Sequence, residues 1–262
     1  MAHRARKWGQ HWLASDELAE ALVALVQPLP EDHFIEIGPG RGRLTEALLR
    51  YPVRITAVEI DPECHDHLLS LGYGKRLMVM NVDILAADPI LPWDDGRIRL
   101  IGNLPYEISS PVLRWTARRR SNLIDAHYML QADVAERIAA SPGCRAYGLL
   151  SVLMQWEFSV HILKRLSPGA FRPEPRVRSA FVRLTPHAES ATGRSAHQVA
   201  VLQAAFGHRR KMLVSALAMG GWRREVAEQA CAKADLDPRA RAENLSPQDF
   251  LRLGAALPEV EA

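Results

Sequence analysis

The residues best suited to chemistry lie together at Asn103-Leu104-Pro105-Tyr106, directly after an apolar stretch. Pro105 lacks a backbone N–H and pushes Leu104 out of the helical conformation, so the Leu104 carbonyl oxygen has no helical partner. The Asn103 amide offers a second acceptor, and the Tyr106 ring offers a flat surface. Two acceptors beside an aromatic ring suit an exocyclic amine on a planar base. A plain strand-to-loop turn is the alternative, because Asn and Pro both favour turns.

A glycine-rich segment, Glu36-Ile37-Gly38-Pro39-Gly40-Arg41-Gly42, follows a short apolar stretch and predicts a tight strand-to-helix turn. Such turns are typical of nucleotide-binding α/β folds. The dinucleotide fingerprint needs a third glycine where this chain has Arg43. A nicotinamide-dependent oxidoreductase is therefore the least favoured alternative, and Gly38 and Gly40 are candidate contacts for another nucleotide cofactor.

Acidic residues mark the ends of the next two expected strands, with Glu59 at the second and Asp83 after the third. Doubly wound sheets bind ligands at the carboxyl ends of their strands, so both acids are expected beside the glycine turn. Glu59 can accept from both hydroxyls of a ribose, and Asp83 from an adenine amine. Ile60 and Ile84 adjoin these acids and could sandwich the adenine ring. Helix capping is the alternative role for either acid.

The elements that must position these residues alternate between strands and helices. Strands are expected at 33–37, 53–60, 77–82, 97–102, 124–130, 158–163 and 177–184, and helices at 16–26, 111–118, 132–139 and 149–154, with others after the first two strands. This order predicts an α/β fold with a mostly parallel sheet covered by helices on both faces.

A polar stretch with Pro and Gly, residues 185–193, predicts a linker between two domains. Residues 1–187 are expected to form the α/β domain, which includes a basic segment at its N-terminus. Residues 188–262 are expected to form a small helical domain. Its task is either RNA contact through the segment from Phe206 to Lys211 or simple packing.

The composition is that of a soluble globular protein, with 48% hydrophobic and 24% charged residues among 262. No apolar run is long enough for a membrane span, so a cytoplasmic protein is expected. Nothing demands more than a monomer. The three cysteines are odd in number and widely spaced, which argues against a disulfide framework and against a metal site.

The net charge is only +3, but most of the 33 basic residues are arginines, and they occur in clusters. Arginine suits phosphates and stacks on bases, so clusters on a shared face would indicate nucleic-acid binding. A solvated surface is the alternative. The clusters are Arg4, Arg6 and Lys7; Arg114 and Arg118 to Arg120; Arg172, Arg176, Arg178 and Arg183; and Arg209, Arg210 and Lys211.

With these residues placed, the sequence resembles the ribosomal RNA adenine dimethyltransferase family nearly end to end. The matching motifs are Gly9-Gln10-His11-Trp12-Leu13, Glu36-Ile37-Gly38-Pro39-Gly40, Asn103-Leu104-Pro105-Tyr106, Met129-Leu130-Gln131, Tyr147-Gly148, Leu150-Ser151-Val152, and Phe171 followed by a Pro-containing loop. The branch that acts on small-subunit RNA is further indicated by Leu104, by Phe206 with Arg209-Arg210-Lys211, and by Arg241-Ala242-Glu243-Asn244.

The resemblance implies a Rossmann-like methyltransferase domain that uses S-adenosylmethionine. It implies cofactor contacts from Gln10, His11, Leu13, Gly38, Gly40, Glu59, Asp83 and Asn103. It also implies that Asn103, Leu104, Tyr106 and Phe171 hold the target adenine. The chain departs from the family pattern with His11 for Asn, Trp12 for Phe, Glu107 for Asn and Ala132 for Lys.

The expected reaction is dimethylation of two adjacent adenines near the 3′ end of small-subunit ribosomal RNA, coupled to ribosome assembly. Accepting both amine hydrogens would aim the nitrogen lone pair at the methyl group. The expected partners are this RNA and the immature small subunit. Two alternatives remain: an RNA-binding assembly factor without turnover, suggested by His11 and Glu107, and a large-subunit methyltransferase of the resistance type.

Overall fold

The computed structural model describes residues 11–87, 91, 93, 98–188 and 195–259 and divides into two compact units. The first unit comprises residues 1–135 and 158–187, and the second comprises residues 136–157 and 188–262. The first contains β1 (Trp12–Leu13), α1 (Asp16–Val26), β2 (His33–Ile37), α2 (Arg43–Leu49), β3 (Arg54–Val58), α3 (Pro62–Ser70), β4 (Leu77–Met80), β5 (Ile98–Asn103), η3 (Tyr106–Ile108), α4 (Ser109–Arg118), β6 (Leu123–Gln131), β7 (Phe158–Leu166), β8 (Phe171–Arg172) and β9 (Ser179–Pro186).

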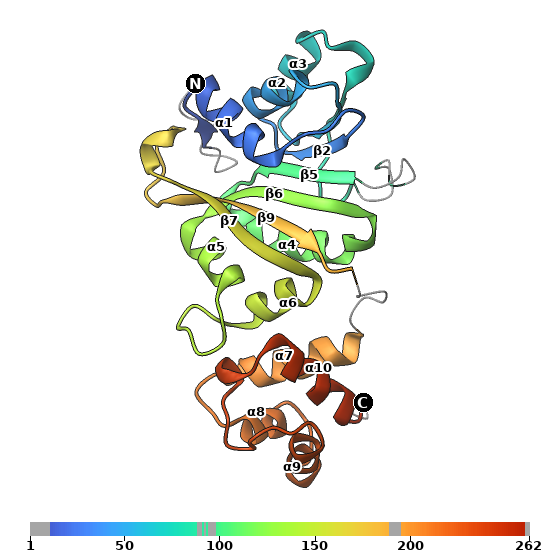
Figure 1. The fold of residues 1–262 in the computed structure, drawn as a ribbon, viewed down its shortest axis with the longest axis vertical. Helices are drawn as coiled ribbons and strands as arrows, with labels where there is room; N and C mark the ends of the chain where they lie inside the picture. Colours follow the sequence, from blue (N-terminus) through green and yellow to red (C-terminus); the bar gives the residue numbers. More distant parts are fainter. Residues whose placement is uncertain (1–10, 88–90, 92, 94–97, 189–194, 260–262) are drawn as a thin grey trace. The chain divides into compact units, whose positions relative to one another are not determined.

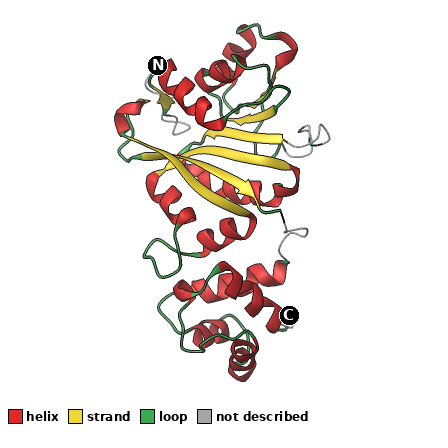
Figure 2. Ribbon diagram, in the orientation of Figure 1, coloured by secondary structure: helices red, strands yellow, loops and turns green. Residues whose placement is uncertain are grey.

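The first unit is built on a seven-stranded sheet in the order β4-β3-β2-β5-β6-β9-β7 (Figure 2). Strands β4, β3, β2, β5 and β6 run parallel to one another, whereas β9 runs antiparallel to β6 and β7. This sheet confirms the predicted α/β class with a mostly parallel sheet. The chain leaves β2 towards β3 and leaves β5 towards β6, in opposite directions. Because such crossovers are right-handed, α2 and α4 cover opposite faces (Figure 1).

Helix α1 shows how local sequence sets these elements. The Ser15 hydroxyl accepts from the Leu18 amide at the N-terminus, and Asp16 and Glu17 in the first turn favour the positive end of the helix dipole. Apolar residues recur at helical spacing and bury one face of the helix: Ala19, Leu22, Val23 and Val26. The predicted range of 16–26 is confirmed because cap and periodicity agree.

Strands β2 and β5 approach each other too closely for a side chain at Gly102. A Cβ added there would lie 2.6 Å from the Ile37 carbonyl oxygen. Gly102 therefore allows the two central strands to end side by side, and it places Asn103 at the carboxyl edge of the sheet.

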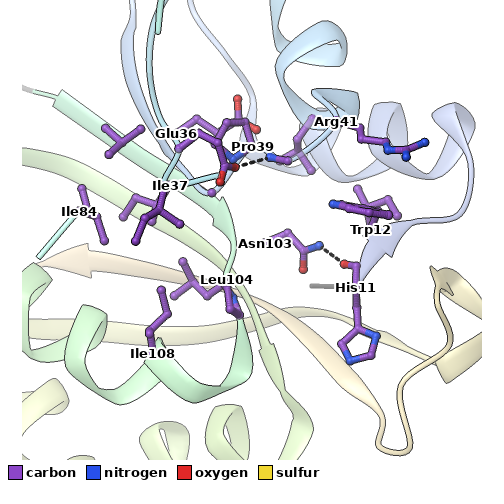
Figure 3. Close-up of a pocket in the computed structure, with 18 of the residues that line it drawn as sticks. His11, Trp12, Glu36, Ile37, Pro39, Arg41, Ile84, Asn103, Leu104 and Ile108 are labelled. Carbon is purple, nitrogen blue, oxygen red and sulfur yellow. Dashed lines mark hydrogen bonds between the residues drawn. The ribbon is translucent and has the colours of Figure 1, made fainter. Parts of the chain in front are cut away.

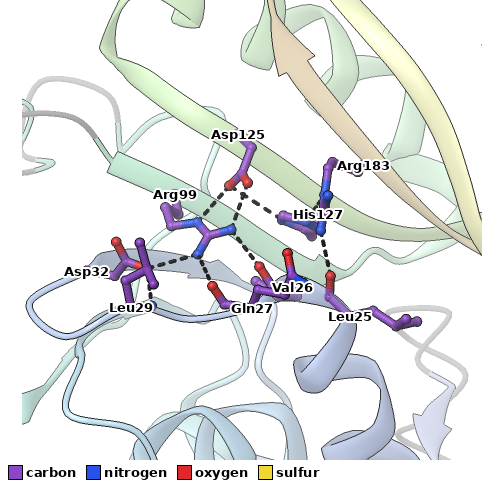
Figure 4. Close-up of polar contacts among 9 residues, drawn as sticks. All are labelled: Leu25, Val26, Gln27, Leu29, Asp32, Arg99, Asp125, His127 and Arg183. Atoms are coloured by element: carbon purple, nitrogen blue, oxygen red, sulfur yellow. Dashed lines mark hydrogen bonds and ion pairs between the residues drawn. The ribbon is translucent and has the colours of Figure 1, made fainter.

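A buried polar network ties α1 to β5 and β6 (Figure 4). Arg99 donates to both carboxylate oxygens of Asp125 at 2.9 and 2.7 Å, and to Asp32 at 2.8 Å. It also donates to the carbonyl oxygens of Val26 and Gln27, which satisfies acceptors at the end of α1. Such a buried cation is stabilised by its paired acceptors, so Arg99 fixes α1 against the sheet.

Arg183 belongs to the same network, although the sequence grouped it with arginines that could contact nucleic acid. Its guanidinium donates to His127 Nε2 at 2.9 Å and to the Leu25 carbonyl at 2.5 Å. These contacts hold Arg183 inside the fold. It is therefore removed from the candidate RNA-binding residues.

Among the described residues, the second unit contains one α-helix that precedes β7 in the sequence and four α-helices that follow β9. These are α6 (Leu149–Glu157), α7 (Ala196–Gly207), α8 (Leu213–Met219), α9 (Arg224–Lys233) and α10 (Pro247–Ala256), while α5 (Ala132–Ala139) crosses the boundary between the units. The helical C-terminal region agrees with the prediction. Within the part of the chain that the structure describes, no helix is both long and apolar enough to traverse a bilayer.

Residues 136–157 pack with the C-terminal helices, although the sequence assigned them to the first domain. Tyr147, Val152 and Trp156 share a core with residues of α7 to α10. The Tyr147 hydroxyl donates to the Leu245 carbonyl at 2.8 Å, and the Trp156 indole donates to the Pro247 carbonyl at 2.7 Å. The expected linker also starts later, since β9 extends to Pro186; residues 189–194 lie outside the described residues.

In the Phe206–Lys211 segment, some residues pack within the unit and others are exposed and free to contact RNA, the two roles that the sequence left open. Phe206 packs, because its ring centroid lies 5.5 Å from that of Phe250 and 6.2 Å from that of Tyr147. Arg209 is paired with Glu243 at 2.7 Å. Arg210 and Lys211 are exposed.

The buried His127 makes stability depend on pH. Burial lowers the pKa of His127 to about 4; the charge of Asp125 opposes this shift, and the charges of Arg99 and Arg183 add to it. Because this pKa lies below the ordinary value of 6.5, the unfolded chain binds the proton first, and the free energy of unfolding falls as the pH drops from 6.5 towards 4. In His127→Gln, an amide oxygen accepts from Arg183 at every pH. The free energy of unfolding of the unmodified chain, relative to that of this variant, should fall by about 2 kcal/mol between pH 7 and pH 4.5.

Denaturant unfolding of both proteins at the two pH values measures this difference, and effects of other titrating groups cancel in the comparison. A difference in the free energy of unfolding that stays constant with pH would contradict the assignment of His127 as a neutral, buried acceptor.

Candidate active site

A cavity of about 460 Å³ opens where the first four parallel strands end, which is where the sequence placed the site. Its volume lies in the usual range for small-molecule sites. The cavity is lined by these predicted residues: His11, Leu13, Gly38, Gly40, Glu59, Ile60, Asp83, Ile84, Asn103, Leu104, Pro105 and Tyr106. Gln10 lies outside the described residues. The site lies between β2 and β5, at the point where the strand order reverses.

The glycine turn after β2 uses left-handed backbone that glycine adopts freely, with φ of +63° at Gly38 and +57° at Gly40. The Gly40 amide donates to Glu59 Oε2 at 2.9 Å. A Cβ on Gly40 would lie 2.7 Å from the indole nitrogen of Trp12. Gly40 is therefore required both by its conformation and by the ring packed against it.

Glu59 is held by two backbone donors, Gly40 N–H on one oxygen and Asp61 N–H on the other at 2.8 Å. Its side chain is buried, and burial raises its pKa while these hydrogen bonds oppose the rise. Each carboxylate oxygen keeps a second lone pair, so Glu59 can still accept from hydroxyl groups.

Glu36 is a cavity residue that the sequence treated only as part of the glycine motif. It accepts from the Thr45 hydroxyl at 2.7 Å. Burial raises the pKa of Glu36 to about 8, and the neighbouring charge of Glu59 adds to the rise. Glu36 is therefore mostly neutral at pH 7.

The N-terminal segment forms one wall of the cavity. Strand β1 pairs with β8 in antiparallel register, so that Leu13 lies opposite Phe171. Arg43 donates to the Leu13 carbonyl and pairs with Asp16 at 3.2 Å. The Arg41 guanidinium lies 4.8 Å from the centre of the Trp12 ring. In the sequence, Arg43 was noted only because it stands where the dinucleotide fingerprint has its third glycine. In the structure, it holds this wall through its contacts with Leu13 and Asp16.

Asn103 is oriented by the backbone of this same wall. Its amide nitrogen donates to the His11 carbonyl at 2.6 Å, and Figure 3 shows the amide oxygen turned away from that bond. The Leu104 N–H donates to the Met129 carbonyl at 3.3 Å. No described residue donates to the Leu104 carbonyl. Among the described residues, no donor thus reaches the Asn103 amide oxygen or the Leu104 carbonyl, so both acceptors lie beside the cavity without a partner there.

Tyr106 completes the motif in η3. Its hydroxyl shares a hydrogen bond of 2.8 Å with the Ser179 hydroxyl. Burial raises the pKa of Tyr106 above its ordinary value, so the ring stays neutral. The contact with Ser179 fixes the ring at its far end.

The structure does not bring Phe171 to the cavity. This side chain is only 1% exposed and packs in the core of the first unit, against the residues that support β1. It presents no face to a base, and the neighbouring Arg172 lines the cavity instead. Phe171 therefore does not stack on a base, as the sequence predicted, but packs in the core that supports strand β1.

Asp83 combines both roles that the sequence considered. One carboxylate oxygen accepts from the Leu85 amide at 2.9 Å, which caps a turn. The residue is nevertheless exposed and lines the cavity together with the buried Ile84.

Comparison with known proteins identifies the family. Residues 1–257 match the family described as "Ribosomal RNA adenine dimethylase". The chain belongs to this family. It is 40% identical over 258 residues to the "Ribosomal RNA small subunit methyltransferase A" of Bordetella petrii, covering 97% of this chain and 96% of that protein. It is 42% identical over 252 residues to the protein of the same name from Xanthomonas campestris pv. campestris, covering 94% and 93%.

Two solved structures share the fold of this dimethylase. The "dimethyladenosine transferase from Plasmodium falciparum" has a TM-score of 0.75 at 24% identity and covers 93% of this chain and 96% of its own. "23S rRNA methyltransferase ErmE" has a TM-score of 0.71 at 24% identity, with 94% and 99% covered. The family confirms the predicted class, an adenine dimethyltransferase that uses S-adenosylmethionine.

The cavity of the dimethylase fits this cofactor. Glu59 would accept from the ribose hydroxyls with its free lone pairs, and the left-handed glycines would let a ligand approach the backbone closely. Ile60 and Ile84 would cover the adenine ring with apolar surface.

Arg43 should govern cofactor affinity through the wall that it holds. In Arg43→Ala, the Leu13 carbonyl and Asp16 lose their donor, so the wall loosens and S-adenosylhomocysteine should bind about tenfold more weakly. Calorimetric titration measures this change. Arg50→Ala is the matched control, because it removes an exposed arginine that pairs with Glu20 away from the cavity. Equal affinities for the two variants would contradict the assigned role of Arg43.

Proposed function

We propose that this dimethylase modifies N6 of two adjacent adenines near the 3′ end of small-subunit ribosomal RNA. The observation that carries the proposal is the pair of unpartnered acceptors, the Asn103 amide oxygen and the Leu104 carbonyl, beside the cavity. The names of the relatives from Bordetella petrii and Xanthomonas campestris support the small subunit as the source of the RNA.

The chemistry is one of positioning. The N6 amine of adenine is a weak nucleophile because its lone pair is delocalised into the ring. By accepting both amine hydrogens, Asn103 and Leu104 favour a pyramidal nitrogen and aim its lone pair into the cavity. S-adenosylmethionine supplies the electrophilic methyl group when it is bound. Direct displacement then requires no nucleophilic side chain of the protein.

Orientation of the Asn103 amide is the critical element. If the amide were flipped, its N–H₂ group would face the amine, and this group cannot accept the amine hydrogens. The His11 carbonyl prevents this flip, because only the amide nitrogen can donate to it. The proposed cofactor contacts of His11, Leu13 and Asn103 lie along the same wall.

The target adenine must leave its stack to reach these acceptors. Tyr106 supplies a replacement stacking surface, and loops of RNA release a base more easily than helices do. Exposed basic residues are proposed to hold the RNA: Arg172, Arg176, Arg178, Arg210 and Lys211. We further propose that the chain acts as a monomer on immature small subunits in the cytoplasm, and that methylation is coupled to their assembly.

Each of the two alternatives can be distinguished from the proposed activity. A factor without turnover has no need of preformed acceptors beside a cofactor-sized cavity, so the Asn103 geometry favours an enzyme. A large-subunit methyltransferase has the same fold, as the likeness to ErmE illustrates. Mapping the modified adenines therefore separates it from the proposed activity.

Methylation of immature small subunits with labelled cofactor tests the proposal. The unmodified chain should label N6 of two adjacent adenines. Asn103→Ala removes one acceptor, so its kcat should fall about 100-fold. Its affinity for S-adenosylhomocysteine should fall much less, because Gly38, Glu59 and Asp83 remain.

Absence of label on small-subunit adenines, with a folded protein that binds S-adenosylhomocysteine, would refute the proposed substrate. A kcat of Asn103→Ala equal to that of the unmodified chain would refute the proposed role of the amide.

A further inference from the structure

The imidazole of His11 lies against the ring of Tyr106 inside the cavity. The two ring centroids are 5.4 Å apart, and the ring planes are inclined by 31°. Both residues line the cavity.

The two rings leave no room for a base between them. A base sandwiched between two aromatic rings separates their centroids by about twice the spacing of one stacked pair, or about 7 Å or more. The observed 5.4 Å is the spacing of a single ring contact. An adenine and the His11 imidazole therefore compete for the same face of Tyr106.

The Tyr106 ring is the fixed partner of the pair, because its hydroxyl is bonded to Ser179. The His11 imidazole is held at its edge by a hydrogen bond of 2.7 Å between Nδ1 and the Pro173 carbonyl. The His11 side chain is half-exposed, so rotation about its Cα–Cβ bond can carry the ring into solvent. Its backbone carbonyl need not move, since β1 and the Asn103 amide hold it.

We propose that the His11 side chain occupies the base-stacking face of Tyr106 in the absence of RNA and is displaced by the target adenine. This inference rests on the proposed function, because it requires that a flipped adenine stacks on Tyr106. Entry of the base breaks the bond to Pro173 and the contact between the two rings. His11 thus has two separate tasks: its carbonyl orients Asn103, and its imidazole opposes entry of a base.

Replacing the ring while keeping the backbone separates these tasks. His11→Ala and His11→Asn both remove the imidazole and leave the carbonyl that Asn103 needs. With the cofactor site saturated by S-adenosylhomocysteine, both variants should bind adenosine 5′-monophosphate about threefold to tenfold more tightly than the unmodified chain. His67→Ala is the matched control, because His67 is an exposed residue of α3 that does not line the cavity.

Steady-state methylation of immature small subunits gives a second readout. The KM for subunits should fall by a similar factor in both His11 variants, because the ring no longer opposes entry of the base. Nucleotide binding and KM unchanged from His67→Ala would overturn the inference, since the ring would then oppose nothing. Weaker binding or a higher KM would also overturn it, because the imidazole would then contribute to base binding.

These outcomes are distinct from a failure of the proposed function. If the unmodified chain binds S-adenosylhomocysteine and methylates small subunits, the proposed function stands whatever the His11 variants do. If the unmodified chain methylates no adenine, the proposed function fails before the variants are compared.

Discussion

The site depends on one hydrogen bond, from the Asn103 amide nitrogen to the His11 carbonyl oxygen at 2.6 Å. This bond joins the end of a central strand to the residue that precedes the two-residue strand β1, far away in the sequence. It selects one of two amide orientations, and that choice decides whether Asn103 can accept from an amine or only donate to it. The chemistry proposed for the site is therefore set by a contact outside the Asn-Leu-Pro-Tyr motif.

The rest of the first unit supports that contact from two sides. Gly102 lets β5 lie close against β2, which places Asn103 at the reversal point of the sheet. Strand β8 and Arg43 hold β1, and with it the His11 carbonyl. The buried Phe171 packs with this support. A motif residue that faces the core can thus matter to the reaction without touching a substrate.

The sequence predicted the parts that depend on local pattern or on sheet geometry. Helix α1 has a cap and an apolar period that agree, and Glu59, Asp83 and Asn103 lie at one edge because parallel strands end together. The internal hydrogen bonds of Arg183 were missed, since its Leu25 partner is 158 residues away. Two further contacts were missed for the same reason: the packing of Trp156 with the C-terminal helices, and the hydrogen bond from Arg43 to the Leu13 carbonyl.

Nuclear magnetic resonance of the Asn103 side-chain amide tests the central claim most directly. With the signal assigned by its loss in Asn103→Asp, the account predicts one strongly downfield-shifted Nδ2 proton that exchanges slowly with solvent. Such a proton would report the bond to the His11 carbonyl in the absence of RNA. Two amide protons at ordinary positions with rapid exchange would contradict the account, because the acceptor of the amine would then not be oriented before the substrate arrives.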